Sequence, residues 1–559
     1  MIPSCPEEKL KVWAPDGSME HLARKLNCSS FMASLLWMRG IDEGAAQSDR
    51  KKWINPDLAA WLDSVDLGEG SQKARDIWSG LKEGDNVVVY GDYDVDGISS
   101  TTFMMELALM KKARVRYYIP HRYNQGYGLH QSVVKAIAGA GRKCDLLVVV
   151  DCGTQNRDAA LNAKAAGIPV VIFDHHLTQG HPTAGDALVN PQVDGNKLGK
   201  QLCAAGVAWC WAGKNGMAPQ DWLLKRLDLT ALATLADCVP MSSPVNRAIV
   251  REGIASMRRY PRKGLLALMR GMDLDPQSID TDSLTMRIIP CLNAAGRLEL
   301  ADLAMNLFFP KDDVEEQAQK LINLNRRRRD ISARIINDVY SGISSNDRYR
   351  HVLFGRDWPA GVLSSVASHV CAERDVPIVL AAPAQPQLIR GTLRVPNGVD
   401  AEAILAAISD DLASWGGHRM AAGFSVSGDK WAEVRDRLEE LLSNAKVSDD
   451  KEDILYWSPA ELDLNAWKDA ERLGPFGVDN PHPKLFCSNK GEINAEPLGK
   501  KGNHIKIFVD GREILGFSGE HLLNSDFSPS GWVYRPRVNF WRFSESLQLV
   551  LEKVVVSGS

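Results

Sequence analysis

Short apolar runs alternate with helical segments between residues 86 and 240. Four of these runs predict strands that are buried on both faces, because they leave no polar face for solvent. The runs lie at residues 86–90, 115–119, 146–150 and 170–173, and helical segments such as 99–112 and 158–166 separate them. The alternation of strand and helix predicts a parallel sheet with right-handed crossovers.

The pattern changes near residue 311. Apolar positions three or four apart predict one long helix over residues 311–344, which contains four consecutive arginines at 326–329. These arginines fit either a solvated face on a helix that bridges two lobes or a basic wall along a nucleic-acid path. A second strand–helix unit follows, with strands predicted at 351–354, 377–381 and 388–395.

Both ends of the chain have their own patterns. Residues 1 to about 80 show helical spacing, and residues 448–469 begin with a polar, charged stretch that is typical of a linker. Beyond residue 470, short strands separated by turn residues predict a small barrel. These strands lie at 505–509, 513–517, 532–540 and 547–556. The expected segments are therefore 1–80, 81–310, 311–345, 346–447, 448–469 and 470–559.

The composition is ordinary for a soluble protein of several domains: 559 residues, 45% hydrophobic and 24% charged. The net charge of −4 does not indicate a nucleic-acid binder, so such binding would need local basic patches. No apolar run approaches the roughly 20 residues of a membrane span, and the N-terminus has no signal-peptide core. The ten cysteines form no CxxC pair. We therefore expect a cytoplasmic protein with reduced thiols.

Candidate chemistry begins directly after the first apolar run. The segment GDYDVDG at residues 91–97 sets Asp92, Asp94 and Asp96 at alternate positions. Open α/β sheets place their ligands at this end of the strands. Three crowded carboxylates are unfavourable unless a cation neutralises them, and oxygen ligands suit Mg²⁺ or Mn²⁺. An isolated segment of this kind would fit an Asp-rich turn, but more of the same chemistry follows.

Three further apolar runs end in residues of the same type. Asp151 follows the third run, Asp174, His175 and His176 follow the fourth, and Asp237 follows the run at 231–236, which we also interpret as a strand. Because the carboxyl ends of parallel strands share one edge of a sheet, these residues are expected to converge.

A site of several carboxylates and an imidazole fits two Mn²⁺ or Mg²⁺ ions about 3.5–4 Å apart, as in two-metal phosphoesterases. The imidazole favours Mn²⁺. One carboxylate must bridge such a pair, and Asp151 is the candidate because it stands alone between two richer clusters. Neighbouring side chains on an extended segment point to opposite faces, so His175 and His176 have different roles. One binds metal; the other can contact the scissile phosphate or protonate the leaving oxygen.

The order of these motifs resembles that of the DHH phosphoesterase family. GDYDVDG, DCGT at 151–154, DHH at 174–176 and ADCVP at 236–240 correspond to its four signatures, and WGGHRMAAG at 415–423 is similar to the GGH motif of its DHH-associated domain. PCLNAAGRL at 290–298 and LGPFGVDNP at 473–481 resemble segments of the RecJ type. The resemblance runs from about residue 20 to the C-terminus.

The resemblance implies an α/β fold. It consists of a parallel-sheet DHH domain at 81–310 and a second α/β, DHH-associated domain at 346–447, joined by a long helix. An OB-like, nucleic-acid-binding β-barrel would follow at 470–559.

The resemblance also implies a hydrolase, a nuclease of DNA repair and recombination. Such an enzyme degrades single-stranded DNA 5′→3′ to 5′-mononucleotides, using a hydroxide that two divalent metal ions activate. We expect a monomer that does not bind membranes. Its candidate protein partners are a single-strand-binding protein or a helicase. One alternative is a DHH-family phosphodiesterase for short oligonucleotides or cyclic dinucleotides. Another is a non-enzymatic single-strand-binding subunit, although such relatives tend to lose acidic ligands and this chain retains them.

Residue roles follow from the same resemblance. Asp94 and Asp151, with Asp92, correspond to the ligands of one metal ion. The other ion would be bound by Asp96, Asp151, His175 and Asp237. His176 corresponds to the phosphate-facing histidine, so Asp151 and His176 are the expected catalytic residues.

The expected substrate-binding residues lie in both lobes and in the barrel. Those for the DNA strand and its phosphates are Arg122, Tyr127, Asn293, Arg297, Thr392, Arg394, Gly417 and His418. In the barrel, the basic and aromatic side chains that suit a single strand are those of Lys501, His504, Lys506, Arg537 and Trp541. The barrel could also be a structural cap. The sequence departs from the family pattern at Cys291, Leu393, Val395 and Asp479, and Thr392 stands where a serine is usual.

Overall fold

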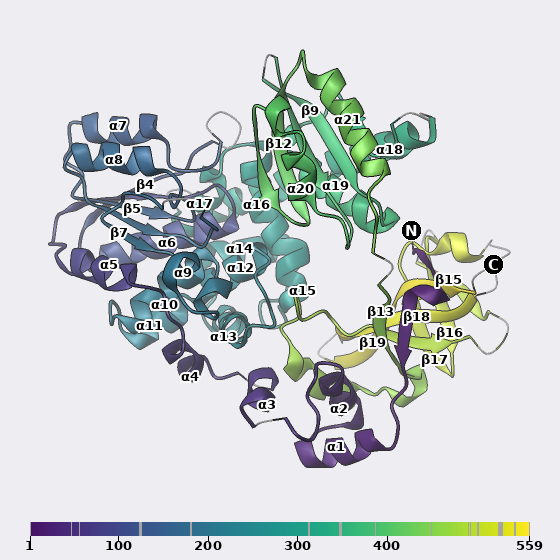
Figure 1. The fold of residues 1–559 in the computed structure, drawn as a ribbon. Helices are drawn as coiled ribbons and strands as arrows, with labels where there is room; N and C mark the ends of the chain where they lie inside the picture. Colours follow the sequence, from purple (N-terminus) through teal and green to yellow (C-terminus); the bar gives the residue numbers. More distant parts are fainter. Residues whose placement is uncertain are drawn as a thin grey trace. The chain divides into compact units, whose positions relative to one another are not determined.

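The computed structural model describes all residues except 1, 46, 55, 122–125, 179–181, 311–312, 346–348, 386, 449, 490, 492, 500–501, 524–528, 542–543 and 558–559. The chain divides into two compact units (Figure 1). The first unit contains Met1–Val65, Cys238–Ile254 and Asp449–Ser559, and the second contains Asp66–Asp237 and Ala255–Ser448.

A five-stranded parallel sheet forms the first lobe of the second unit. Its order is β4-β3-β5-β6-β7. The bounds are β3 Asn86–Tyr90, β4 Arg114–Tyr118, β5 Leu146–Val150, β6 Val170–Phe173 and β7 Ala187–Val189. The four strands expected in this region, and the parallel sheet, are therefore confirmed. Strands β5 and β6 are buried over their whole length, as their continuous apolar runs predict.

Helices cover both faces of this sheet. On one face, α7 (Gln131–Gly139) and α8 (Arg157–Ala165) pack on alternate strand residues such as Val88 and Leu147 (Figure 1). The opposite face contacts α5 (Gly70–Ser79), α6 (Val95–Met110) and α10 (Ala204–Lys214). The remaining elements of this lobe are α9 Pro191–Asp194, η2 Gly199–Gln201, α11 Gln220–Lys225, α12 Leu227–Ala236, α14 Lys263–Gly271, α15 Thr281–Ser283, η3 Leu284–Ile288, α16 Ile289–Leu298 and α17 Asp302–Phe308.

One predicted strand is wrong. Residues 231–236 lie in helix α12, which packs against α6, so Asp237 follows a helix and not a strand. Alanine and leucine are strong helix formers. Every residue from Leu227 to Leu235 is buried, so the helix has no polar face to reveal its 3.6-residue period.

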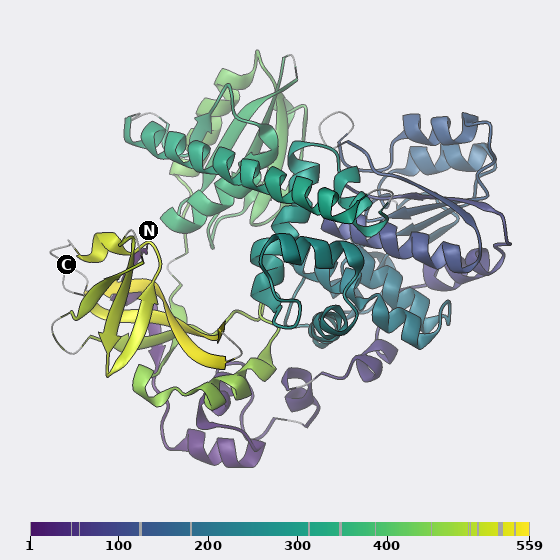
Figure 2. The same cartoon turned by 180° about the vertical axis from the view of Figure 1, so that it is seen from behind.

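The long helix is confirmed as α18, Val314–Ser345 (Figure 2, teal). It contacts α14, α16 and α17 on one side of the second unit and α19 (Ala360–Arg374) in the next lobe. Arg326, Arg327 and Arg329 are exposed on it, and Arg328 is half-buried. This agrees with a solvated helix that bridges two lobes.

The second lobe of this unit is a five-stranded sheet in the order β11-β12-β10-β9-β8. Only β8 and β9 are parallel, and the other pairs are antiparallel. One face packs on α18 and α19, and the other on α20 and α21. The bounds are β8 Val352–Phe354, β9 Ile378–Gln385, β10 Leu388–Arg394, β11 Ser414–His418, β12 Ala421–Ser427, α20 Ala401–Ala406 and α21 Trp431–Ser443.

The first unit contains a nine-stranded sheet in the order β15-β16-β17-β19-β18-β14-β13-β2, with β1 paired to β19. Closure of this sheet into a barrel stays a prediction. The strands are β1 Ser4–Pro6, β2 Leu10–Trp13, β13 Glu452–Tyr456, β14 Leu485–Ser488, β15 Ala495–Leu498, β16 His504–Val509, β17 Arg512–Gly516, β18 Pro529–Trp541 and β19 Ser544–Val556. The helices are α1 Ser18–Leu26, α2 Ser30–Trp37, α3 Gln47–Trp53, α4 Leu58–Asp63, most of α13 Pro244–Arg259, and α22 Leu464–Ala470.

Two expectations for this unit are corrected. Residues 4–13, expected to be helical, form β1 and β2, which pair in parallel with β19 and β13. Residues 448–469, expected to be a linker, contain β13 and most of α22. These strands are too short to show alternation, and β1 and β2 pair with strands more than 400 residues away, which no local pattern can reveal.

Candidate metal centre

The loop between β3 and α6 is held rigidly in place. Asp94 caps α6, since its Oδ1 accepts hydrogen bonds from the backbone N–H groups of Asp96 (3.0 Å) and Gly97 (3.1 Å). A Cβ atom at Gly97 would lie 2.4 Å from the carbonyl oxygen of Asp92, so only glycine fits there. The loop thus brings its carboxylates to the positive end of a helix dipole.

The LNAAGR segment on α16 supports this loop from outside. Asn293 Oδ1 accepts a hydrogen bond from the backbone N–H of Val95 at 3.2 Å. A Cβ atom at Gly296 would lie 2.6 Å from the carbonyl oxygen of Tyr93. Asn293, which we expected to bind substrate, is therefore placed where it fixes the backbone of the carboxylate loop.

Asp96 points to the start of another helix. Its two oxygens accept hydrogen bonds from the backbone N–H groups of Ala204 (2.7 Å) and Ala205 (2.8 Å) at the N-terminus of α10. The side chain is almost completely buried. Burial, and next the charge of Asp94, raise the pKa of Asp96 to about 7.

Asp151 and Asp237 complete the carboxylates. Asp151 directly follows β5 and has a positive φ of 59°, while Asp237 follows α12. Burial and the repulsion of Asp96 raise the pKa of Asp151 well above its usual value. The same two causes raise the pKa of Asp237 to about 8. Carboxylates that repel one another so strongly at neutral pH indicate a place for cations.

His175 faces this cluster with its Nε2 atom. That atom lies 3.4 Å from an oxygen of Asp151, 3.5 Å from one of Asp237 and 3.8 Å from one of Asp96. It is buried and makes no hydrogen bond within the described part of the chain. Burial lowers the pKa of His175 to about 3, so its imidazole is neutral and keeps a lone pair for a metal ion.

These ligand atoms form three groups, within each of which all atoms lie within 4.8 Å of one another, and the group of Asp151, His175 and His176 shares one residue with each of the other two. Asp92, Asp94 and Asp151 form one group, and Asp96, His175 and Asp237 form another. Asp151 belongs to the first group and touches His175 of the second. The residues therefore fit two hard divalent cations with Asp151 between them.

Asp174 orients the second histidine. Its Oδ1 lies 2.8 Å from His176 Nδ1, and its Oδ2 accepts hydrogen bonds from the backbone (3.1 Å) and hydroxyl (2.6 Å) of Thr154. Burial lowers the pKa of His176, but the hydrogen bond to Asp174 and the negative charges of Asp174, Asp237 and Asp96 together outweigh it, and the pKa is raised to about 9. Tyr127 brings its hydroxyl to within 2.9 Å of the same Nδ1 atom.

The sequence alone did not assign Asp174 this role. Both of its oxygens are engaged, and it belongs to none of the groups of potential metal ligands. The only signal is indirect: Thr154 follows Asp151 by three residues, at a neighbouring strand end where its hydroxyl can reach Asp174.

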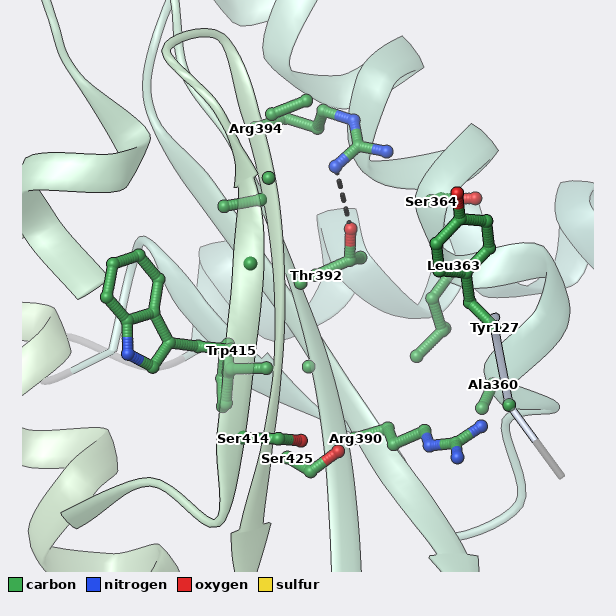
Figure 3. Close-up of a pocket in the computed structure, with 18 of the residues that line it drawn as sticks. Tyr127, Ala360, Leu363, Ser364, Arg390, Thr392, Arg394, Ser414, Trp415 and Ser425 are labelled. Atoms are coloured by element: carbon green, nitrogen blue, oxygen red, sulfur yellow. Dashed lines mark hydrogen bonds between the residues drawn. The ribbon is translucent and has the colours of Figure 1, made fainter. Parts of the chain in front are cut away.

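A cavity of about 520 Å³ lies beside this centre, between the two lobes of the second unit (Figure 3). It brings together four residues expected to bind substrate: Tyr127, Thr392, Arg394 and Gly417. Arg394 is held by Ser368 Oγ (3.0 Å) and Thr392 Oγ1 (2.8 Å).

Two other expected substrate residues lie outside the cavity lining. Arg297 reaches from α16 to α19, where it donates a hydrogen bond to Ser364 Oγ at 3.0 Å. His418 ends β11 and is exposed, and its charge helps to lower the pKa of His175. The departures Leu393 and Val395 are buried in the core on the opposite face of the sheet, and Cys291 is also buried. These three substitutions therefore do not face the cavity from β10, where Thr392 in place of a serine is the one departure among its cavity-lining residues.

Some of the expected DNA contacts lie outside the described residues. These are Arg122 in the second unit and, in the first unit, Lys501 and the side chain of Trp541. On the described surface, Lys506 pairs with Glu513 at 2.8 Å. His504 and Arg537 both lie against the Phe517 ring, at centroid distances of 5.5 and 5.4 Å.

Three family models match the chain in order. The DHH family N-terminal domain matches residues 86–234, the DHHA1 domain matches 346–444 and the RecJ OB domain matches 455–553. The chain belongs to the DHH family and is of the RecJ type. The described part of the chain contains no helix with the length and apolar character needed to cross a bilayer.

Curated relatives agree with this family. The chain is 28% identical over 565 residues to the single-stranded-DNA-specific exonuclease RecJ of Bacillus subtilis, which covers 98% of this chain and 71% of that protein. It is also 28% identical to the RecJ of Escherichia coli, over 87% of this chain and 90% of that protein.

Solved structures show the same fold. RecJ of Thermus thermophilus in complex with Mn²⁺ matches with a TM-score of 0.81 and 24% identity, covering 99% of this chain and 80% of that one. A structure of exonuclease RecJ bound to manganese is 28% identical, with a TM-score of 0.57, over 68% of this chain and 96% of that chain.

We expect Mn²⁺ to raise the melting temperature more at about pH 8 than at about pH 5.5. The pKa values of Asp96 and Asp237 are raised above those of the unfolded chain. Without metal, the folded state therefore binds more protons than the unfolded state between about pH 4 and pH 8, and its stability falls as pH rises through this window. Bound Mn²⁺ removes this loss.

Differential scanning calorimetry with and without Mn²⁺ measures the gain. Asp237→Asn should reduce it, and Glu433→Gln, an exposed control on α21, should leave it unchanged. An equal gain at both pH values would contradict the account.

Asn293→Ala should weaken Mn²⁺ binding about tenfold, because the loop that presents the carboxylates loses its support. Isothermal titration of metal-free protein with Mn²⁺ gives the affinity. Asn293→Asp, which keeps an acceptor oxygen, should lose less. Unchanged affinity in Asn293→Ala would show that the loop needs no support from α16.

Proposed function

We propose that this chain is a single-stranded-DNA-specific exonuclease that uses two divalent metal ions. The observation that carries this proposal is the convergence of five aspartates and His175 in two neighbouring groups beside a cavity lined with cationic side chains. The substrate class is inferred from the RecJ relatives, which are named single-stranded-DNA-specific exonucleases. Mn²⁺ is favoured over Mg²⁺ because a neutral imidazole belongs to the ligand set.

The ligands divide between the two ions. We assign Asp92, Asp94 and Asp151 to one, and Asp96, His175 and Asp237, together with Asp151, to the other. When bound, the pair of ions activates a water for attack on phosphorus and neutralises the charge that develops on the phosphate. In a 5′→3′ exonuclease that releases 5′-mononucleotides, the P–O3′ bond of the terminal nucleotide breaks. A 5′-mononucleotide leaves, and the shortened strand carries a new 5′-phosphate.

His176 faces the phosphate in this proposal. Its Nδ1 is engaged by Asp174, which leaves Nε2 for the substrate. Against the effect of burial, the hydrogen bond to Asp174 and the surrounding carboxylate charges raise the pKa of His176 to about 9, so the ring is protonated at neutral pH. It can therefore stabilise the charged phosphate or donate a proton to the departing 3′ oxygen.

The second lobe would hold the 5′ end of the strand. Arg394 is fixed by Ser368 and Thr392, which sets its guanidinium for a phosphate. Tyr127 offers an exposed ring to an unstacked base at the opposite wall of the cavity. The 5′→3′ polarity follows from this terminal-phosphate role of Thr392 and Arg394.

The first unit would provide additional contacts to a long single strand. His504 and Lys506 on β16 and Arg537 on β18 give it cationic and aromatic groups on one sheet. As further parts of the proposal, the chain acts as a cytoplasmic monomer in DNA repair and recombination, alone or with a single-strand-binding protein or a helicase.

Asp151→Ala should lower the rate of mononucleotide release from single-stranded DNA at least about 1000-fold, because it removes the carboxylate shared by both ions. Release is followed by chromatography of digests in Mn²⁺. A melting curve in the presence of chelator should show that the variant is folded. Wild-type turnover by this variant would contradict the metal assignment. Faster hydrolysis of a dinucleotide or cyclic dinucleotide than of a long strand would instead favour a short-oligonucleotide phosphodiesterase.

Asp174→Asn should lower kcat about 100-fold while changing KM little, because His176 loses the charge that keeps it protonated and oriented. Its pH–rate profile should lose activity at a lower pH than that of the wild type, since the pKa of His176 falls. Stopped assays between about pH 6 and pH 10 measure the profile. An unchanged profile would mean that Asp174 only supports the backbone.

A further inference from the structure

One face of the second-lobe sheet carries its polar side chains in rows that run across the strands. Burial alternates along β10, so Arg390, Thr392 and Arg394 share the face that lines the cavity. Strand register then aligns each with a residue of β12 and, one strand further on, with a residue of β11. The rows are Arg390–Ser425–Ser414, Thr392–Gly423–Gly416 and Arg394–Ala421–His418.

The middle row is open. A Cβ atom at Gly416 would meet nothing within 4 Å, and one at Gly423 would meet only the carbonyl oxygen of Gly391, at 3.8 Å. Neither glycine has a positive φ. Gly417, by contrast, is required by the fold: its φ is 155° and its Cβ would lie 2.4 Å from the carbonyl oxygen of Ala421. The β11 and β12 positions of the middle row, which we call the Gly416–Gly423 floor, therefore carry no side chains, although the packing leaves room for them.

Arg390, in the first row, differs from Arg394 in the third. Arg394 is tied to Ser368 and Thr392. Arg390 is half-buried and has no ion pair or side-chain hydrogen bond within the part of the chain that the structure describes. Figure 3 shows its guanidinium below Tyr127, directed toward Ala360 at the start of α19. A partly desolvated guanidinium without an acceptor is costly, and an anion would relieve that cost.

The nearby groups also suit an anion. Ser414 and Ser425 lie in the same row as Arg390 and line the cavity with it. Their hydroxyls can donate hydrogen bonds. The first backbone N–H groups of α19 begin at Ala360, and no side chain caps them. Donors therefore surround the mouth of the cavity at Arg390.

The spacing along β10 separates Arg390 from the terminal-phosphate position. Four residues of strand correspond to about 13 Å between the Cα atoms of Arg390 and Arg394. A single phosphate that is gripped by Arg394 and Thr392 lies at one end of this span. An anion at Arg390 is therefore a different group.

We infer that Arg390, with Ser414 and Ser425, binds a second phosphate of the single strand, across the Gly416–Gly423 floor from Arg394. This inference rests on the proposed function and adds a specificity-determining residue to it. The cavity would then select a strand that continues beyond its terminal phosphate. The guanidinium would hold this second phosphate with two parallel hydrogen bonds.

The test measures binding in the inactive Asp151→Ala background, so that no turnover is needed. The probes are 5′-phosphorylated single strands in which one phosphodiester at a time, counted from the 5′ end, is replaced by an uncharged methylphosphonate. Fluorescence anisotropy gives the affinity of each strand. Adding Arg390→Ala should weaken binding of the fully charged strand about tenfold and reduce the salt slope by about 0.7. A neutral linkage at one position near the 5′ end should weaken the Asp151→Ala parent but not the double variant.

Arg390→Lys, which keeps the charge but not the two parallel bonds, should lie between the parent and Arg390→Ala. Lys446→Ala removes an exposed cation of the same lobe outside the cavity lining and should bind as the parent does. Equal melting temperatures would exclude misfolding as the cause.

If Arg390→Ala binds as the parent does, or still responds to every neutral linkage, the inference is overturned while the proposed function stands. If the parent binds no single strand and the wild type cleaves none, both fail together.

Discussion

Mutual repulsion among buried carboxylates is the constraint on which the rest of this structure depends. Burial, and next the charges of neighbouring carboxylates, chiefly Asp94 and Asp96, raise the pKa values of Asp96, Asp151 and Asp237. Such a cluster destabilises the folded state unless cations occupy it. Much of the surrounding architecture holds these charges in place: the cap at the start of α6, the N-terminus of α10 beneath Asp96, and Asn293 on α16.

The same arrangement separates two kinds of histidine. His175 is buried against the carboxylates and stays neutral, which suits a ligand. His176, one residue later, is tied to Asp174 and is protonated, which suits a group that meets a phosphate. Adjacent residues on an extended segment point in different directions, so one short sequence provides both a metal ligand and a cation. In the proposed function, the cavity beside them would supply the phosphate and base contacts of a nuclease site.

Local pattern predicted the part of this site that depends on buried parallel strands. Continuous apolar runs end at Asp92, Asp151 and Asp174, and topology brings such ends together. Asp237 was placed correctly beside the others but on the wrong element, because a fully buried helix of alanine and leucine shows no period. The N-terminal strands and β13 escaped prediction since their partners lie far away in sequence. Arg390 and Asp174 could be interpreted only from strand register and hydrogen bonds, which require coordinates.

In the proposed function, two cations share Asp151. Electron paramagnetic resonance of metal-free protein titrated with Mn²⁺ tests it most directly, because two Mn²⁺ ions that share a carboxylate are magnetically coupled. We expect two ions to bind per chain with a coupled spectrum, and Asp237→Asn to bind a single uncoupled ion. Binding of only one ion by the wild type, or of two ions without coupling, would contradict it.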